Sequence, residues 1–453
     1  MKGISTDVRA NDIPKDLRAF LKRPVLIILT IGIIIRVVLM PVLTVGYDVM
    51  HWALAMQHIQ SGSGLYDIAG YWYTPVWGYI LGFMSSIMNM FGVTDYGSLF
   101  DEALHLEDLG WISATIPTPA FSFIVKIPSV IADVLVGYLI YRMIVERTGD
   151  EKKATYGFAL WFLCPIVIFT SSVHGMFDSI YVLFTVLSVY SLLKGHDLLA
   201  GVSLSIAVLL KIFPLYIAFA LIAYLAMKHK GDPRTFRRRT LTMAIGFAVM
   251  TFIVYIPQIL DGTVMDSLLF LTTRIDTPAA ASERMWDTLI ATGMMLITWL
   301  QIVFLILAAA VAYKMYKKDP ADKEKALFTC LMATTLIIFL WPTESQFLLL
   351  PLPFLIFFIV LYDKRFTLPF LLIAIGAVFI TVSPSVLLSL AAYTDILDLG
   401  SVISLVELTH GRLAFELSVM DIVHATGAAV ALAGVVTAVI YWLRMEREGK
   451  NDA

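Results

Sequence analysis

The chain has 453 residues, of which 59% are apolar and 15% charged, and its mean hydropathy is +0.83. Soluble domains carry roughly 25% charged residues, so this composition excludes a cytosolic enzyme and indicates an integral membrane protein. The 33 Lys and Arg nearly balance the 35 Asp and Glu, so no global basic surface points to nucleic acid as a partner. The two cysteines, Cys164 and Cys330, lie in apolar runs and predict neither a disulfide framework nor a cysteine-rich metal site.

The first 23 residues carry six Lys and Arg spread among polar residues. No compact basic region and no small-residue cleavage site precede the apolar run that starts at Pro24. We therefore expect that run to be a retained transmembrane helix and not a signal peptide.

A spanning helix needs about 20 mostly apolar residues. Such runs lie at 24–45, 119–145, 154–173, 177–193, 240–260, 287–313, 325–342, 346–361, 366–392 and 419–443. Two further stretches are ambiguous. They are 73–92 and 198–227, and the second is interrupted by Lys211 and Pro214.

The distribution of basic residues decides both, because cytoplasmic loops collect Lys and Arg. Basic residues group in the N-terminus, 142–153, Lys194, 228–239, 314–325, 364–365 and 444–450, which together hold 27 of the 33. All of these can be placed on one side of the membrane. The stretch 46–118 has seven acids and no Lys or Arg, so it is predicted to be external throughout. The segment 73–92 should then lie along the interface or dip in and return.

The segment 198–227 is flanked on both sides by predicted cytoplasmic residues. It should therefore form a hairpin of two short helices with its apex near Lys211. The resulting prediction is an all-α polytopic membrane protein with about 12 transmembrane helices and both termini cytoplasmic. Further external loops are expected at 261–286 and 393–418, and the sequence has no internal repeat.

Charges inside the apolar segments are expensive, at about 3 kcal/mol or more each, and so point to pairing or function. Arg36 and Asp133 lie at comparable depth in their helices and are expected to form a buried ion pair, with direct substrate contact as the alternative. Lys211, beside the helix-breaking Pro214, could bind an anionic lipid head group or could snorkel at a helix end.

Three polar groups lie at the predicted external face. Asp48, in GYDVMHW, could act as a general base on a hydroxyl or be an ordinary loop acid or helix cap. His174 and Asp178, in SSVHGMFDS, lie in a predicted short external turn and could bind sugar hydroxyls or a metal, or Asp178 could cap a helix. The segments WPTESQ at 341–346 and THGR at 409–412 add further polar side chains to the same face.

The order of these pieces resembles the GT-C glycosyltransferases, and most closely the dolichyl-phosphate-mannose-dependent mannosyltransferases of glycosylphosphatidylinositol synthesis. The matching residues are Tyr47 and Asp48, SGLYD at 63–67, YTPVWGYIL at 73–81, Lys126 and Asp133, CP at 164–165, HGMFDS at 174–179, KIFP at 211–214 and ESQFLLLPLPF at 344–354. They cover roughly residues 30–230 well and the rest loosely. One departure is Gly46, which stands where the family often has the first acid of a D-x-D pair. A divalent metal held by paired carboxylates is therefore not supported, and no other cofactor is implied.

The resemblance implies an inverting transfer of a sugar, mannose in the nearest relatives, from a polyprenyl (dolichyl) phosphate donor to a lipid-linked or glycolipid acceptor. Asp48 would be the catalytic base, and Lys211 would stabilise the leaving phosphate, with Arg412 as the second choice. The expected substrate-binding residues are Lys211, Asp178, His174, Tyr73, Lys126, Glu344, Gln346, His410 and Arg412.

This interpretation divides the chain into a cytoplasmic segment 1–23, a GT-C catalytic module 24–230, a transmembrane module 231–443 and a cytoplasmic tail 444–453. The site would face outside the cell, or the lumen of the endoplasmic reticulum in a eukaryote, among membrane lipids. The main alternative is a secondary transporter or lipid flippase, which typically shows internal repeats and midplane charges. A non-catalytic subunit that works with a partner subunit is a third possibility.

Overall fold

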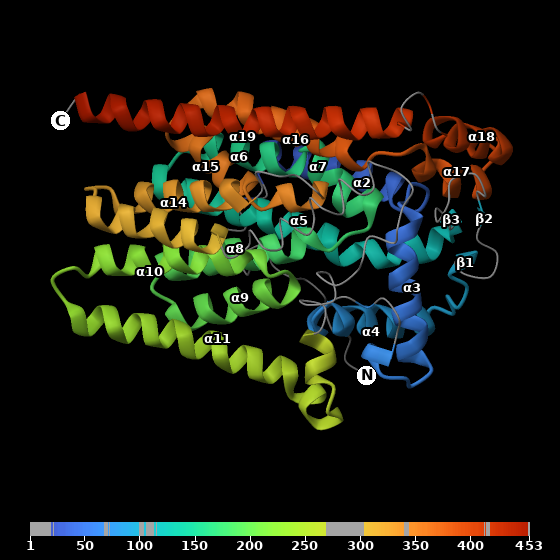
Figure 1. Ribbon diagram of the computed structural model, residues 1–453, viewed down its shortest axis with the longest axis horizontal. Helices are drawn as coiled ribbons and strands as arrows, with labels where there is room; N and C mark the ends of the chain where they lie inside the picture. The colour runs from blue at the N-terminus through green and yellow to red at the C-terminus, as the bar shows by residue number, and fades with distance from the viewer. Residues whose placement is uncertain are drawn as a thin grey trace, which may run out of the picture.

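The computed structural model describes residues 20, 22–67, 71, 73–98, 104–105, 113–114, 116–268, 303–338, 344–411, 413 and 417–451. The described chain is almost entirely helical, and most of its helices lie side by side along the long axis of the molecule (Figure 1). The helices are α2 (Arg23–Leu39), α3 (Gly46–Gln60), α4 (Pro75–Met90), α5 (Pro119–Thr148), α6 (Glu151–Phe162), α7 (Pro165–Ile168), α8 (Asp178–Leu193), α9 (Asp197–Leu210), α10 (Ile217–Lys228), α11 (Pro233–Asp261), α14 (Lys323–Ile338), α15 (Leu352–Leu361), α16 (Thr367–Thr381), α17 (Leu388–Tyr393), α18 (Leu399–His410) and α19 (Val419–Asn451). An additional helix covers 303–318.

Short elements connect these helices. Short 3₁₀ helices are η2 (Leu65–Asp67), η5 (Phe213–Tyr216), η6 (Ser345–Leu349), η7 (Lys364–Phe366) and η8 (Pro384–Leu387), whereas η4 (Phe169–His174) is a wider π-helical turn. Two antiparallel pairs of two-residue strands join β1 (Gly97–Ser98) to β4 (Ile116–Pro117) and β2 (Leu104–His105) to β3 (Ser113–Ala114). Together with α17 and α18 they form one end of the molecule, opposite the C-terminal end of α19 (Figure 1).

Within these described ranges, four helices are long and apolar enough to cross a bilayer. They are Pro119–Thr148, Pro233–Asp261, Lys364–Thr381 and Val419–Met445, and several shorter apolar helices accompany them. The predicted all-α membrane protein is confirmed, whereas the number of twelve spans stays a prediction. Of the predicted span 287–313, only the part from residue 303 lies within the described residues.

Two predicted spans are not single straight helices. The run 154–173 bends by 50° between α6 and the segment Pro165–His174, because a proline at the start of α7 lacks the N–H that would continue the helix. The run 366–392 ends as a helix at Thr381. The chain is extended at Val382 and Ser383, and Pro384 then begins η8.

The predicted external segment 46–118 contains helices that differ in direction. α3 runs across the ends of the long helices, whereas α4 runs roughly along them (Figure 1). The Thr74 hydroxyl, just before α4, donates a hydrogen bond to the Leu209 carbonyl at the end of α9. The start of α4 therefore lies beside the turn after α9, as a segment that dips inward and returns would.

The hairpin predicted for 198–227 is present as α9, η5 and α10, with Lys211 directly after α9. The basic segments also gather, since ion pairs join residues from different connections. These pairs are Lys22–Glu151, Arg147–Asp322 and Lys230–Asp319, with N···O distances of 2.6, 2.8 and 2.9 Å. The α10–α11 connection and the C-terminal end of α19 lie at the same end of the bundle (Figure 1).

The predicted pair between Arg36 and Asp133 is confirmed. Both side chains are completely buried, and the Arg36 Nη2 and Nε lie 2.9 and 3.0 Å from Asp133 Oδ2. The guanidinium also donates to the Phe162 carbonyl at 3.0 Å. The pair therefore joins α2 to α5 and α6 in the interior, and it is structural.

Candidate functional site

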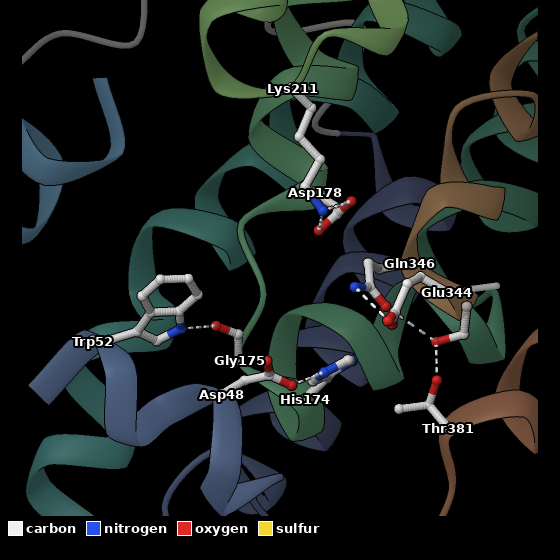
Figure 2. Close-up of polar contacts among 10 residues, drawn as sticks. Asp48, Trp52, His174, Gly175, Asp178, Lys211, Glu344, Gln346 and Thr381 are labelled. Carbon is white, nitrogen blue, oxygen red and sulfur yellow. Dashed lines mark hydrogen bonds and ion pairs between the residues drawn. The ribbon is translucent and has the colours of Figure 1, made fainter. Parts of the chain in front are cut away.

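Asp48 lies in the first turn of α3, directly after the connection that follows α2. The positive end of the helix dipole favours a carboxylate there. Its Oδ2 is 2.6 Å from Nε2 of His174, which comes from the end of η4 (Figure 2). The Asp48 side chain is 29% exposed and that of His174 is 1% exposed. The carboxylate can therefore be reached from outside, while the imidazole supports it from within.

The backbone beside His174 explains how the two residues meet. Gly175 has a φ of +80°, which disfavours other residues, and an added Cβ would lie 2.8 Å from the Val49 side chain on α3. The indole N–H of Trp52, also on α3, donates to the Gly175 carbonyl at 3.1 Å. The tight turn after His174 is thus packed directly against the helix that carries Asp48.

The proton on this pair can be assigned from its surroundings. Burial raises the pKa of Asp48, but the hydrogen bond with His174 and the electrostatic interactions with His174, His51 and Lys211 outweigh it and hold the pKa below its usual range. Asp48 is therefore ionised at neutral pH, and Nε2–H of His174 is the donor. Within the described part of the chain, His174 Nδ1 is buried without a hydrogen-bond partner, so it can meet a polar group of a ligand.

Asp178 and Lys211 form a second charged pair. Lys211 Nζ lies 2.9 and 3.0 Å from the two carboxylate oxygens of Asp178, the first residue of α8. The ammonium also lies 4.4 Å from the ring centre of Phe347 and 5.3 Å from that of Phe177, which are cation–π distances. The turn predicted at 171–179 is present between η4 and α8, and both His174 and Asp178 are buried within the protein; that this turn lies on the external side stays a prediction.

Glu344 and Gln346 lie just before and within η6, and they face the same region (Figure 2). The Gln346 amide donates to Glu344 Oε2 at 3.3 Å, and the Thr381 hydroxyl donates to Ser345 at 2.5 Å. Burial raises the pKa of Glu344, and the negative charge of Asp48 raises it further. The two carboxyl groups therefore differ: Asp48 is the stronger acid, and Glu344 retains a proton to higher pH.

An aromatic cluster borders these polar groups. Tyr73, which was predicted as a site residue, packs its ring 5.4 Å from Trp52 and 5.1 Å from Phe177. Trp77 of α4 stacks on Phe177 at 4.5 Å. The segment around Tyr73 and the start of α4 thus supplies one wall of the site, next to the Asp178–Lys211 pair.

The structure brings together most, but not all, of the predicted site residues. Those that converge are Asp48, Tyr73, His174, Asp178, Lys211, Glu344 and Gln346. Arg412 lies outside the described residues. His410, at the end of α18, contacts the Val406 carbonyl at 2.9 Å and Ser383, which lies just after α16, at 3.3 Å. These contacts are with residues outside the group around Asp48.

Lys126 differs from its prediction as a substrate ligand. Its side chain is completely buried, and its ammonium group binds protein oxygens at the end of α2. Phe177 and Phe347 were not predicted, although each directly adjoins a predicted polar residue in the sequence. That adjacency is the signal that could have identified them.

Among the described residues, no three His, Cys, Asp or Glu side chains are grouped so that they could hold a metal ion. The group instead pairs each acid with a nitrogen partner: His174 beside Asp48, and Lys211 beside Asp178. Such an arrangement can hold a base ionised and can bind both hydroxyl groups and an anion.

Comparison with known proteins gives one match. Residues 92–276 match the family model of the GPI transamidase subunit PIG-U, a stretch that covers less than half of the chain. His174, Asp178 and Lys211 lie inside this stretch, and Asp48 and Glu344 lie outside it. No curated protein matches the chain. The matched family belongs to GPI chemistry, as the sequence resemblance did, but its name is that of a transamidase subunit and not of a mannosyltransferase.

Proposed function

We propose that this protein is a glycosyltransferase that moves a sugar from a polyprenyl (dolichyl) phosphate to a hydroxyl group of a lipid-linked or glycolipid acceptor. The observation that carries this proposal is the ionised, reachable Asp48, held by His174 and next to the buried Lys211–Asp178 pair. One group can accept a proton, and the other carries a fixed cation for a leaving anion. Mannose is the proposed sugar because of the sequence resemblance.

The reaction follows from these roles. The acceptor hydroxyl loses its proton to Asp48 as its oxygen attacks the anomeric carbon. The bond between that carbon and the phosphate oxygen breaks on the opposite face, so the configuration inverts. Polyprenyl phosphate leaves with the bonding electrons, and the ammonium of Lys211 stabilises its growing negative charge more than that of the bound donor. Asp178 holds the ammonium in place and neutralises it between turnovers.

The remaining side chains suit the binding of a sugar. His174 Nδ1, Glu344 and Gln346 offer acceptors or donors for hydroxyl groups. The partly exposed ring of Tyr73, which packs against the buried rings of Trp52 and Phe177, offers an apolar face beside them. A mostly apolar wall with a few placed polar groups is typical of small-molecule sites.

The proposed orientation places the site on the external or lumenal side of a cell or endoplasmic reticulum membrane. The basic connections that gather at the other end of the bundle support this placement, since basic loops stay in the cytoplasm. The donor tail would then lie in the bilayer while its phosphate reaches Lys211.

A second candidate function is supported by the family match. A stretch similar to a GPI transamidase subunit would also suit a subunit that binds a glycolipid for a partner and performs no transfer itself. In that case the same group of residues would recognise the lipid-linked glycan, and Asp48 would contribute to binding alone.

The experiment is a release assay with purified protein in nanodiscs. Radiolabelled polyprenyl-phosphate mannose and a membrane lipid extract are supplied, and the release of polyprenyl phosphate is measured. Asp48→Asn should lower the rate constant by about 10²–10⁴-fold with little change in donor binding, because it removes the base and almost no volume. Glu407→Gln, on the exposed side of α18, is the matched control and should keep the wild-type rate.

Each outcome separates the two functions. Release that depends on Asp48 supports the transferase, and the labelled product identifies the acceptor. Donor binding without release by the wild-type protein refutes the transferase and favours the subunit. Absence of both donor binding and release also refutes the transferase, and the subunit function is then tested by binding of a labelled glycolipid, whose absence refutes it.

A further inference from the structure

Lys126 is a buried cation that the proposed reaction does not use. It lies in α5 with no exposed surface. Its Nζ is 2.9 Å from the Met40 carbonyl, 2.7 Å from the Leu43 carbonyl and 2.7 Å from Thr44 Oγ1. A fourth contact, at 2.9 Å, is with Ser122 Oγ one turn earlier in α5. Burial of an ammonium group costs free energy, and the hydrogen bonds to these four oxygens offset that cost.

One of these acceptors, the Met40 carbonyl, lies at the C-terminal end of α2. Met40 follows the last residue of α2, where carbonyl groups have no helical N–H partner. A cation at a helix C-terminus satisfies such carbonyls and also interacts favourably with the helix dipole. Lys126 thus holds the connection 40–44 against α5 from inside the protein.

That connection leads directly to Asp48. The Val45 N–H donates to the Val173 carbonyl at 3.4 Å, which ties the start of α3 to the residue before His174. The aliphatic stem of Lys126 lies beside Gly175, the residue after His174, since a Cβ added to Gly175 would lie 3.3 Å from Lys126 Cε. One side chain therefore contacts both the connection that places Asp48 and the turn that places His174.

We propose that Lys126 is a positioning residue that sets the distance between Asp48 and His174. Lys126 acts on Asp48 and His174 indirectly, through the backbone at 40–44 and at Gly175. The consequence for catalysis rests on the proposed function, whereas the consequence for the geometry does not.

The geometric test is hydrogen–deuterium exchange of the full-length protein in nanodiscs. Lys126→Met removes the ammonium but keeps an unbranched side chain. Backbone amides in 44–50 and 173–176 should exchange about tenfold faster than in the wild type, because their shared support is lost. The double variant Arg36→Met/Asp133→Leu is the matched control. It removes a buried charge pair from the same two helices, α2 and α5, and should leave those amides unchanged.

The catalytic test uses the release assay. Lys126→Met should lower kcat by about 10²-fold, as expected for a misplaced catalytic group, while the KM for the donor stays near the wild-type value. The acidic limb of the pH profile should also move to higher pH. Asp48 would lose the hydrogen bond with His174 that offsets the effect of burial on its pKa, so that pKa would rise. A residue that serves stability alone would reduce the folded fraction and leave the pH profile of the folded protein in place.

Several results would overturn the proposal. Unchanged exchange at 44–50 and 173–176 in folded Lys126→Met would do so, as would an unchanged pH profile in an active variant. Thr44→Val removes one of the four acceptors and keeps the side-chain shape, so it covers the case in which Lys126→Met does not fold. It should accelerate exchange in the same two segments to a smaller degree, and no acceleration would reject the idea. If the wild-type protein releases no polyprenyl phosphate, the proposed function fails, but exchange still decides the role of Lys126.

Discussion

The buried pair of Arg36 and Asp133 allows a quantitative test of the interior. Both side chains have no exposed surface and their charged atoms are 2.9 Å apart. Removal of one partner leaves the other charge buried without its counterion, which costs about 3–5 kcal/mol. Arg36→Met and Asp133→Leu should each destabilise the protein by that amount. The double variant should lie near the wild type, because a buried pair replaced by apolar side chains of similar volume is often neutral or stabilising.

The assay is reversible unfolding by sodium dodecyl sulfate in mixed micelles, followed by tryptophan fluorescence. The control is Lys22→Met combined with Glu151→Gln, which removes a 2.6 Å pair whose side chains are 55% and 43% exposed. That change should alter the free energy of unfolding by less than about 1 kcal/mol. The reasoning is refuted if either single variant costs less than the exposed control. It is also refuted if the double variant is as unstable as the sum of the singles.

Three further predictions concern the site and its support. His174→Leu should move the acidic limb of the pH–rate profile of transfer to higher pH. Since His174 lowers the pKa of Asp48, its loss leaves burial to raise that pKa, and Asp48 is protonated at a higher pH. An unmoved acidic limb in the measured profile would argue against the pair. Lys211→Met should reduce transfer and also weaken donor binding, as measured by titration with labelled polyprenyl phosphate, whereas equal affinity for the phosphate would remove Lys211 from the anion site. Gly201→Val should destabilise the packing of α9 on α11 by about 1–3 kcal/mol or more, because its Cβ would lie 1.9 Å from the Met243 carbonyl; wild-type thermal stability of the variant would contradict that close approach.

The sequence was sufficient for the class of protein and for several elements of the site. Hydropathy predicted apolar helices, and the distribution of Lys and Arg predicted that 198–227 turns back at Lys211, which the structure confirms. Comparable depth of two opposite charges predicted the Arg36–Asp133 pair. These properties depend on local composition and on the cost of charge in a membrane, and both can be evaluated along the chain.

Other features were not predictable in the same way. The bend at Pro165 and the end of α16 at Thr381 depend on local backbone geometry within runs whose hydropathy is continuous. The burial of Asp178 depends on η5 and η6 packing around it, and the role of Lys126 depends on the end of a helix 82 to 86 residues earlier in the chain.

Sequence alone thus determined a helical membrane protein with carboxylates, an imidazole and cations in a particular order. Only the tertiary structure decided that His174 pairs with Asp48, that Asp178 pairs with Lys211, and that Lys126 supports the connection before Asp48. The physical reason is that hydropathy and charge act on each segment separately, whereas a hydrogen bond requires two atoms within about 3 Å. These partners, 33 to 126 positions apart in the chain, reach that distance only when the helices that carry them have packed.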